Sequence, residues 1–420
     1  MYREVQLKSL LEGRRILIAG YGREGKSSER LIRQLLPDAD LTIVEGNESI
    51  QREAERGYDL ILKSPGIPTF VFEGHCDLST LTSQTDIFLQ VYRDQTFGIT
   101  GTKGKSTTTH LIASLLRCKY SEVIMAGNMG IPLFDIIPDI KPAVPIVCEF
   151  SCHQLENIHC APHVSLLLNL HQEHLDHYHS YEDYQMAKMQ IYLRQREGCD
   201  WCYFCGEDSD LMAMVQKHAT PERRHQCYTA ATEEEYPDYT LSPALRGHHN
   251  RQNLAGALLA VQYEGLDEEA VGYTLQTFQG LDHRLQLVGT HRGITFYNDS
   301  IATIPAATIA ACTALKEVDT LILGGFDRGI DYGELIAYLH AHPVPHLVFV
   351  GEAGRRMKEA YKGDAEVLIE SDYERIIPWC YAHTTPGKIC LLSPAAASYD
   401  AFKNFEERGR VYQQLIEQYA

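Results

Sequence analysis

The residues best suited to chemistry follow a short apolar run near residue 100. The stretch FGITGTKGKSTTTHLIASLL combines that run with a glycine loop, Lys105 and an apolar helix-like segment. Gly101 and Gly104 allow a phosphate to approach the backbone, and Lys105 can reach its terminal oxygens. Ser106 or Thr107 is placed so that its hydroxyl can contact Mg²⁺. The generic phosphate-loop spacing would put its first glycine at Ile99, but the shorter G-T-K-G-K-S core is intact, and it predicts nucleoside triphosphate binding.

Carboxylate and imidazole side chains follow the next two expected strands. PIVCEF carries Glu149 near its end, and VSLLLNL leads into a loop with His171, His174, His177 and His179. Because parallel strands end at one edge of a sheet, these groups suit a hard cation beside the phosphates. Zinc is disfavoured, since this loop has no matching cysteine or second ligand pair. One histidine as an Mg²⁺ ligand fits better.

The N-terminal residues read as a dinucleotide-type unit. An apolar run, ILIA, precedes Gly20-Tyr21-Gly22-Arg23-Glu24-Gly25 and a helical stretch, and LTIVEG follows as a second strand. This G-x-G-x-x-G pattern predicts a nucleotide-type ligand, with a tight strand-to-helix turn as the alternative. A further strand at 60–62 runs into Ser64-Pro65-Gly66, again where open α/β sheets bind ligands.

The remaining elements alternate in the same way. GITFYNDS, TLILGG, HLVFVG and KICLLSP read as strands separated by helices, which indicates a parallel sheet covered on both faces. The expected fold class is α/β in three domains, each with a mostly parallel sheet: an N-terminal Rossmann-like domain, a central P-loop domain and a C-terminal Rossmann-like domain. We expect their boundaries at 1–92, 93–281 and 282–420.

Composition narrows the class of protein. The 420 residues carry a formal net charge of -18, which argues against broad nucleic-acid binding and against a nucleic-acid motor. No run of 18 apolar residues and no signal layout occurs, so a cytoplasmic protein is expected. Twelve cysteines are then expected as thiols. Cys199, Cys202 and Cys205 have metal-loop spacing, but they lack a fourth partner and their stretch reads as an aromatic strand.

In order along the chain, these motifs resemble the Mur ligase family, specifically the MurD type. The likeness spans nearly the whole chain and includes GYGREGKS, SPGIP, AGNMGIP, CEFSCHQLE, NLHQEHLDHY, AKMQIY, GHHNRQNLAGA, GLDHRLQ, YNDSIAT, GGFDRG and LSPAAASYDAFKNFEERG. It implies a UDP-substrate-binding first domain, an ATP-binding second domain and a glutamate-binding third domain. The implied reaction is the ATP-dependent ligation of D-glutamate to UDP-N-acetylmuramoyl-L-alanine through an acyl phosphate, as a step of cytoplasmic peptidoglycan precursor synthesis.

The resemblance also implies roles for individual residues. Catalytic residues would be Lys105, Glu149, His174 and Lys188. Two Mg²⁺ ions would be held by Ser106, Glu149, His174 and Lys188, the last being the family's carbamylated lysine. ATP would contact Gly101, Thr102, Lys103, Gly104, Lys105, Ser106, Thr107, Asn250, Asn253, Arg284 and Asp299. The UDP-linked substrate would contact Gly22, Arg23, Ser64, Pro65, Gly66, Asn128 and Gln154. Glutamate would contact Thr303, Arg328, Ser398 and Phe405.

Several alternatives stay open. Many D-glutamate-adding relatives have lysine where this chain has Ile301, so an L-glutamate-adding ligase on the same precursor is one alternative. A folylpolyglutamate synthase-like ligase is another, although those relatives lack the separate N-terminal domain. A catalytically inactive nucleotide-binding regulator is a third, which the presence of Glu149, His174 and Lys188 disfavours. Small-molecule substrates and a monomer are expected, with neither nucleic acid nor membrane insertion.

Overall fold

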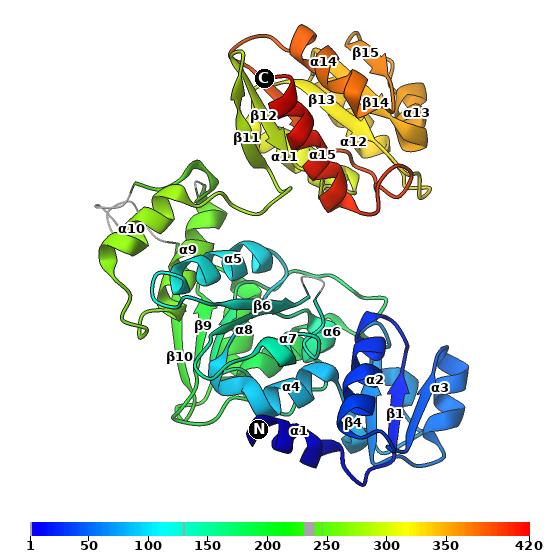
Figure 1. Ribbon diagram of the computed structural model, residues 1–420, viewed down its shortest axis with the longest axis vertical. Helices are drawn as coiled ribbons and strands as arrows, with labels where there is room; N and C mark the ends of the chain where they lie inside the picture. Colours follow the sequence, from blue (N-terminus) through cyan, green and yellow to red (C-terminus); the bar gives the residue numbers. More distant parts are fainter. Residues whose placement is uncertain (1, 129–130, 231–239, 246) are drawn as a thin grey trace. The chain divides into compact units, whose positions relative to one another are not determined.

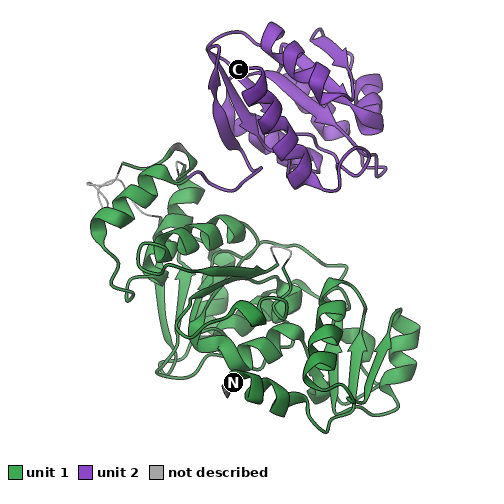
Figure 2. Cartoon of the chain, in the orientation of Figure 1, with its two compact units in different colours: residues 1–278 green, residues 279–420 purple. Residues whose placement is uncertain are grey.

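The computed structural model describes residues 2–128, 131–230, 240–245 and 247–420. The chain forms two compact units, residues 1–278 and 279–420 (Figure 2). Each sheet is mostly parallel, and helices separate most consecutive strands (Figure 1). The predicted α/β class with three mostly parallel sheets is confirmed. The division into three domains is a separate matter, because the first unit contains two of the sheets, and it stays a prediction.

The first sheet has the strand order β2-β1-β3-β4 and is entirely parallel. The strand ILIA at β1 is buried along its whole length, which explains its uniformly apolar sequence. The strands are β1 Ile16–Ala19, β2 Leu41–Val44, β3 Leu60–Lys63 and β4 Leu81–Thr82. The helices are α1 Tyr2–Leu11, α2 Arg23–Leu35, α3 Asn47–Ala54 and α4 Gln84–Tyr92.

The second sheet has the order β10-β9-β8-β5-β7-β6. Its central strand, β5, lies between β7 and β8, and all five of its residues are buried. Its strands are β5 Thr96–Thr100, β6 Ile124–Gly127, β7 Ile146–Glu149, β8 Val164–Leu167, β9 Trp201–Cys205 and β10 Arg224–Tyr228. Its helices are α5 Lys105–Leu116, α6 Cys152–Leu155, α7 Tyr181–Leu193, α8 Ser209–His218, α9 His248–Ala260 and α10 Glu268–Thr277.

The third sheet, in the second unit, has the order β11-β12-β16-β13-β14-β15. Its edge strand β11 runs antiparallel to β12, a hairpin that the sequence reading did not identify. The strands are β11 Gln286–His291, β12 Ile294–Asn298, β13 Val318–Gly324, β14 His346–Val350, β15 Glu366–Ile369 and β16 Ile389–Leu392. The helices are α11 Pro305–Leu315, α12 Gly333–Ala341, α13 Gly351–Ala360, α14 Tyr373–His383 and α15 Phe405–Gln418.

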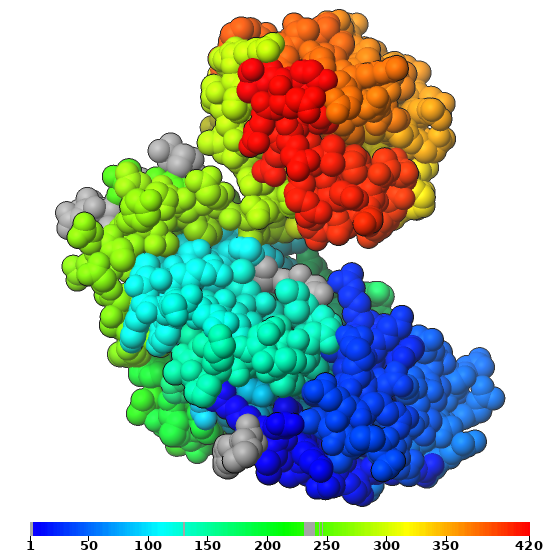
Figure 3. Space-filling model, in the orientation of Figure 1, coloured from blue at the N-terminus to red at the C-terminus, as the bar shows by residue number. Residues whose placement is uncertain are grey.

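Within the first unit, the first two sheets share one apolar core. Leu7 and Leu11 of α1, Ile18 of β1 and Phe88 of α4 belong to the same buried cluster as Ile99 of β5. The space-filling view shows the N-terminal residues, in blue, packed directly against later residues of the first unit (Figure 3). The two sheets are therefore joined by buried surface, and side chains from both can form one site.

The cysteines and the helices bear on two further expectations. All twelve cysteines are free thiols. Cys202 and Cys205 are buried on β9, which confirms the predicted aromatic strand, whereas Cys199 is exposed before it. None of the helices in the described part of the chain combines the length and apolar character that a membrane crossing requires.

Candidate active site

The glycine loop lies between β5 and α5, as predicted. Gly104 precedes the first residue of α5 with φ of 86°, and Gly101 has φ of 149°. A Cβ atom on Gly104 would lie 2.5 Å from Oδ1 of Asn253, and one on Gly101 would lie 3.0 Å from Cβ of Leu168. Both positions therefore need glycine for backbone conformation and for space. Asn253 of α9 lies directly beside the loop.

Asn169, which the sequence reading overlooked, shapes the same loop. Its side-chain oxygen accepts hydrogen bonds from the backbone N–H groups of Thr102, at 2.9 Å, and Lys103, at 2.7 Å. The signal was available, because Asn169 is a polar residue at the end of a buried strand. Lys103 itself is exposed and forms an ion pair with Glu173 at 2.8 Å. The amide of Asn169 thus fixes two of the residues that were assigned to ATP.

Lys105 is folded back onto the loop that precedes it. Its Nζ donates to the carbonyl oxygens of Gly101 and Thr102, each at 3.0 Å. Burial lowers the pKa of Lys105, opposed by the charges of Glu149 and Glu173. The ammonium group is thus held among oxygen atoms at the loop, where an anionic phosphate would be a favourable additional partner.

Glu149 brings two predicted residues together. The carboxylate is only 3% exposed and accepts a 2.6 Å hydrogen bond from Oγ of Ser106 and a 2.8 Å hydrogen bond from Nδ2 of Asn128. Ser106 and Thr107 lie on the first turn of α5, and Glu149 ends β7. The arrangement places a hydroxyl and a carboxylate together beside the glycine loop. These are oxygen donors of the kind that Mg²⁺ prefers.

Lys188 lies inside α7 and is 2% exposed. Its Nζ donates to the carbonyl of Gly101 at 2.9 Å and lies 5.0 Å from the ring centre of Tyr184. Burial lowers the pKa of Lys188 to about 8, partly opposed by the charges of nearby acidic groups. The Tyr184 hydroxyl is in turn 2.7 Å from Oγ1 of Thr102. Lys188 and the glycine loop therefore belong to one site.

His174 lies in the loop after β8, with φ of 58° and a side chain 45% exposed. Its ring is 4.7 Å from that of His153, which is 4.1 Å from that of His177. Burial, together with the charges of His177 and His174, lowers the pKa of His153 to about 3, so His153 is neutral at pH 7. His153 was not singled out in the sequence, although it belongs to the quoted motif CEFSCHQLE.

The set of protein side chains that could bind a metal ion at this site is small. In the described ranges, no group of three or more His, Cys, Asp or Glu side chains could hold a metal alone. Mg²⁺ is commonly held by one or two carboxylates together with substrate phosphates and water. The pairing of Ser106 with Glu149 fits a Mg²⁺ ion whose other ligands would be phosphate oxygens and water.

The N-terminal glycines are explained in large part by packing. A Cβ on Gly20 would lie 2.8–2.9 Å from side-chain atoms of Ile67 and Ser64, and a Cβ on Gly25 would lie 2.2 Å from the carbonyl oxygen of Gly20. The Ser64 hydroxyl donates to that carbonyl at 2.9 Å. The glycine turn and the Ser64–Gly66 loop therefore lie side by side. Gly22, in contrast, has open space where a Cβ would be.

The remaining predicted contacts on this side lie at the surface or at the joint between the two sheets. Arg23 and Gly66 are exposed, and Pro65 is half-buried. Gln154 donates from Nε2 to the Glu24 carboxylate at 2.8 Å, across the joint. Burial raises the pKa of Glu24, opposed by that hydrogen bond and by the charge of Lys63. The structure thus brings Gln154 next to the helix that follows the N-terminal glycine turn.

A buried ion pair crosses the same joint, and the sequence reading missed it. Nζ of Lys63 lies 2.8 Å from Oε2 of Glu156, and Nε2 of His177 lies 3.2 Å from the same oxygen. Burial opposes ionisation of Glu156, but the hydrogen bond from His177 and the charge of Lys63 outweigh it and hold its pKa at about 2. A lysine ending the apolar run LILK was the available signal.

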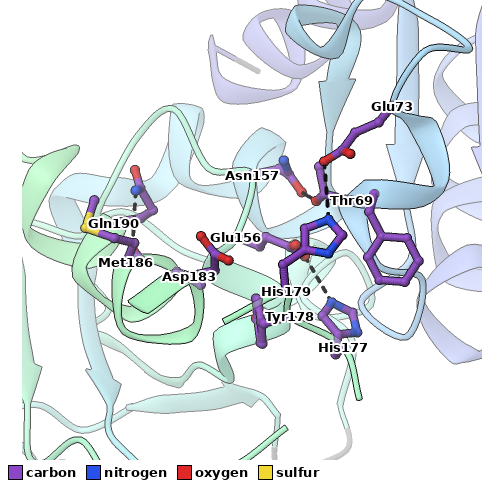
Figure 4. Close-up of a pocket in the computed structure, with 12 residues that line it drawn as sticks. Thr69, Glu73, Glu156, Asn157, His177, Tyr178, His179, Asp183, Met186 and Gln190 are labelled. Atoms are coloured by element: carbon purple, nitrogen blue, oxygen red, sulfur yellow. Dashed lines mark hydrogen bonds and ion pairs between the residues drawn. The ribbon is translucent and has the colours of Figure 1, made fainter. Parts of the chain in front are cut away.

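A pocket of about 240 Å³ opens beside this ion pair (Figure 4). Phe70, Glu73 and Thr69 line it from the N-terminal side, and residues of α7 line it from the other side. Thr69 Oγ1 donates to Oδ1 of Asn157 at 2.9 Å, as one of the dashed lines in the figure shows. The pocket wall is therefore formed by contacts between the two halves of the first unit.

The second unit holds its own cluster of predicted residues. Asp299 follows β12, is 4% exposed, and accepts hydrogen bonds from Ser393 Oγ at 2.7 Å and from Leu285 N–H at 3.1 Å. Burial raises the pKa of Asp299 to about 6, although those hydrogen bonds and the charge of Arg284 oppose the rise. Arg284 is exposed. A buried carboxyl with a raised pKa at the end of a strand is the kind of group found at functional sites.

Of the four residues assigned to glutamate, two contact each other and a third contacts Ser300, the residue after Asp299. Arg328 is exposed, and its guanidinium donates to the carbonyl of Thr303 at 3.1 Å. The carbonyl of Phe405, the first residue of α15, accepts from Ser300 Oγ at 2.8 Å. Ser398 is buried.

In the first unit, Asn250 and Asn253 adjoin each other on α9, with a 3.3 Å hydrogen bond between their side chains.

An additional buried arginine, Arg408, supports this part of the second unit. It is 1% exposed, and its guanidinium donates to Ser300 Oγ at 2.9 Å and to the carbonyls of Ser300, at 2.7 Å, and Ala396, at 3.1 Å. These bonds connect α15 with the loops after β12 and β16. Arg408 belongs to the motif KNFEERG, in which no role was predicted for the arginine.

The chain is similar in sequence to proteins of a known family. Residues 99–270 match the Mur ligase middle domain, and residues 283–396 match the Mur ligase glutamate ligase domain. The chain is 30% identical to a UDP-N-acetylmuramoylalanine--D-glutamate ligase of Desulfitobacterium hafniense, covering 97% of this chain and 98% of that protein. It is 32% identical to the ligase of the same name from Symbiobacterium thermophilum, covering 86% and 84%.

Solved structures agree on the fold. The MurF ligase of Thermotoga maritima in complex with ADP has a TM-score of 0.57 at 16% identity, covering 96% of this chain and 95% of that one. The UDP-N-acetylmuramate-alanine ligase MurC of the same organism has a TM-score of 0.56 at 16% identity, covering 97% and 100%. With two relatives at 30% identity or more over most of both sequences, the chain belongs to the Mur ligase family.

Proposed function

We propose that this chain uses ATP to ligate D-glutamate to UDP-N-acetylmuramoyl-L-alanine, in peptidoglycan precursor synthesis. The observation that carries the proposal is the site around the glycine loop, where Lys105, Lys188 and the Ser106–Glu149 pair meet. The names of the curated relatives support the choice of substrates. We propose three domains, 1–92, 93–281 and 282–420, which bind the precursor, ATP and glutamate, respectively.

The proposed chemistry has two steps. The precursor's terminal carboxylate attacks the γ-phosphorus of ATP, the bond to ADP breaks, and an acyl phosphate forms. The amine of glutamate then attacks the acyl carbon, phosphate leaves, and the amine loses a proton. Both reactants in the first step are anionic, so neutralising their repulsion is the main task. Lys105 supplies fixed positive charge at the loop.

The other residues of the central site have proposed supporting roles. Two Mg²⁺ ions would be held by Ser106, Glu149, His174 and carbamylated Lys188, and would supply charge stabilisation to the phosphates. Lys188 suits carbamylation because its pKa of about 8 leaves part of the amine neutral and able to add CO₂. The loop residues Gly101, Thr102, Lys103, Gly104 and Thr107 are proposed ATP contacts, with Asn250 and Asn253 beside adenine.

The substrates at the two sides of the reaction have proposed contacts as well. Gly22, Arg23, Ser64, Pro65, Gly66, Asn128 and Gln154 are proposed for the UDP-linked precursor. The hydrogen bond between Gln154 and Glu24 supports a precursor site that spans the joint of the first unit. In the second unit, Arg284 and Asp299 are proposed for ATP. Thr303, Arg328, Ser398 and Phe405 are proposed for glutamate, where the exposed guanidinium of Arg328 suits a carboxylate.

A cytoplasmic monomer with small-molecule substrates remains our proposal for its setting. Twelve free cysteines support a reducing compartment. The formal net charge of -18 disfavours nucleic acid as a partner.

The experiment is phosphate release from ATP with UDP-N-acetylmuramoyl-L-alanine and either D- or L-glutamate. Turnover with D-glutamate alone is the expected result. Turnover with L-glutamate alone would overturn the proposed stereochemistry. It would favour an L-glutamate-adding ligase, the alternative suggested by Ile301. The absence of turnover with both enantiomers, despite ATP binding, would overturn the substrate assignment.

A further inference from the structure

Lys63 is a charged residue buried at a joint rather than at a surface. It ends β3, is 3% exposed, and its Nζ donates to two acceptors at 2.8 Å each, the carbonyl of Ile67 and Oε2 of Glu156. The first bond closes the Ser64–Gly66 loop on itself. The second ties that loop to the segment after α6. One ammonium group therefore sets the shape of the loop and its attachment.

Glu156, the partner of Lys63, adjoins residues proposed to bind substrate. It lies two positions after Gln154 in the chain, and it accepts a hydrogen bond from His177 at 3.2 Å. His177 belongs to the loop that carries His174, and its N–H donates to the carbonyl of His174 at 3.0 Å. The Lys63–Glu156–His177 chain thus connects the loop after β3 with the loop after β8.

Two further hydrogen bonds cross the same joint and fix its register. Gln154 reaches Glu24 at the start of α2, at 2.8 Å, and Thr69 reaches Asn157, at 2.9 Å. Figure 4 shows the Thr69–Asn157 and Glu156–His177 contacts around the pocket between the two halves. Lys63 supplies the ammonium group of this set, and it lies nearest in the chain to the Ser64–Gly66 loop.

Stability alone is a weak explanation for the ion pair. Desolvating two charges offsets much of their attraction, so an apolar pair of similar volume is often at least as stable. Burial lowers the pKa of Lys63, which is the mark of that desolvation. A buried ion pair does impose direction, because its hydrogen bonds form in only one arrangement. Such a pair suits a joint whose geometry matters for binding.

We propose that Lys63 is a positioning residue for the UDP-linked precursor, which holds the Ser64–Gly66 loop at a fixed register against Gln154 and the loop of His174. It acts through Ile67 and Glu156 and does not touch the substrate. The inference rests on the proposed function, since it assigns the precursor to this joint. It goes beyond that function in naming what aligns the two halves of the precursor site.

The experiment replaces Lys63 by Met, which keeps the length of the side chain and removes its charge. The expected result is a rise of about tenfold or more in KM for the precursor, equivalent to 1.4 kcal/mol or more. The kcat and the KM for ATP should change by less than about twofold, because the central site retains its residues. Glu156→Gln should raise the same KM, and the double variant should cost less than the sum of the single variants.

Arg93→Met is the matched control. Arg93 forms a partly buried ion pair with Asp200 at 2.9 Å, and it lies just before β5, at the end of that strand opposite the glycine loop. It should lower the melting temperature without raising KM for the precursor. Lys63→Arg retains the charge and should restore much of the affinity. If Lys63→Met leaves that KM unchanged, or if Arg93→Met raises it equally, the inference is overturned.

Calorimetric titration of the same proteins with the precursor distinguishes failure of the inference from failure of the proposed function. Binding to the wild type that weakens in Lys63→Met supports the inference even where no turnover is seen. Equal binding to both proteins overturns the inference and leaves the proposed function intact. No binding of the precursor to the wild type overturns both. Circular dichroism checks that each variant is folded, and Glu156→Gln replaces Lys63→Met if the latter is not.

Discussion

The hydroxyl of Ser106 donates a 2.6 Å hydrogen bond to the carboxylate of Glu149, joining the first turn of α5 to the end of β7. The two residues are 43 positions apart in the sequence, yet the parallel pairing of β5 with β7 brings their segments to one edge of the sheet. A hydroxyl and a carboxylate are thereby held together before any substrate arrives. Preorganisation of this kind lowers the free energy needed to assemble a cation site.

Replacing Glu149 with Gln tests this pair. The amide keeps the shape of the side chain but removes its charge, so turnover should fall by roughly 100-fold or more, and the Mg²⁺ concentration for half-maximal activity should rise. Steady-state rates across a Mg²⁺ titration measure both. Glu122→Gln is the control, since Glu122 pairs with Lys141 at a partly exposed position. Unchanged Mg²⁺ dependence in Glu149→Gln would argue against a cation at this site.

Lys105→Met tests the electrostatic role of the glycine loop. Loss of the ammonium group removes positive charge beside the proposed phosphates, so kcat/KM for ATP should drop by roughly 100-fold or more. Lys119→Met is the control, because Lys119 lies just beyond the opposite end of α5, where it contacts Glu264. Its kcat/KM should remain within about twofold of the wild type. Equal losses in both variants would indicate a general effect on α5 instead.

Much of this site could be predicted from the sequence because its residues lie at strand ends. The run FGIT is buried and strand-like, and it ends in the glycine loop; the run IVCE is likewise buried and ends in Glu149. In a parallel sheet the carboxyl ends of all strands lie at one edge, so Lys105 and Glu149, which follow or end two strands, are expected at that same edge. The inference needed only the positions of these residues relative to the predicted strands. That β7 and not β6 lies beside β5 could not be read from the order along the chain.

The joint of the first unit could not be predicted in the same way. The Lys63–Glu156 pair joins residues 93 positions apart through the packing of two sheets, which no local pattern encodes. Likewise, the hairpin of β11 with β12 was hidden because QLVGTH alternates weakly and is only half-buried. The burial of Asp299 and Arg408 depends on loops that converge only in the folded second unit.

The proposed carbamylation of Lys188 can be tested directly. The pKa of about 8 leaves a neutral fraction of the amine at neutral pH, and only the neutral amine adds CO₂. Incubation with ¹³C-bicarbonate should therefore give one carbamate ¹³C resonance that Lys188→Ala lacks. Activity of the wild type should rise with added bicarbonate after prior removal of CO₂. A carbamate signal that persists in Lys188→Ala would assign the modification to another residue.

Asp299→Asn should stabilise the second unit relative to the wild type, and this difference should grow as pH rises. The folded-state pKa of about 6 exceeds the usual 3.8, so ionisation is less favourable in the folded chain. For a carboxyl with a raised pKa, this destabilisation is absent below about pH 4 and complete above about pH 6. The difference between 3.8 and about 6 corresponds to roughly 3 kcal/mol in the free energy of unfolding. The variant carries no such charge. The difference in free energy of unfolding between variant and wild type should therefore grow by that amount between about pH 4 and pH 6.

The measurement uses denaturant titrations at pH 4, 5, 6 and 7. The chain has two tryptophans, Trp201 and Trp379, so a Trp201→Phe background leaves the fluorescence of Trp379 as a reporter of residues 279–420. Asp364→Asn, at an exposed position, is the control and should show no growing advantage. Because Asp299 is also a proposed ATP contact, the stabilised variant should have lower activity. An advantage of Asp299→Asn that stays constant from pH 4 to 7 would contradict the raised pKa.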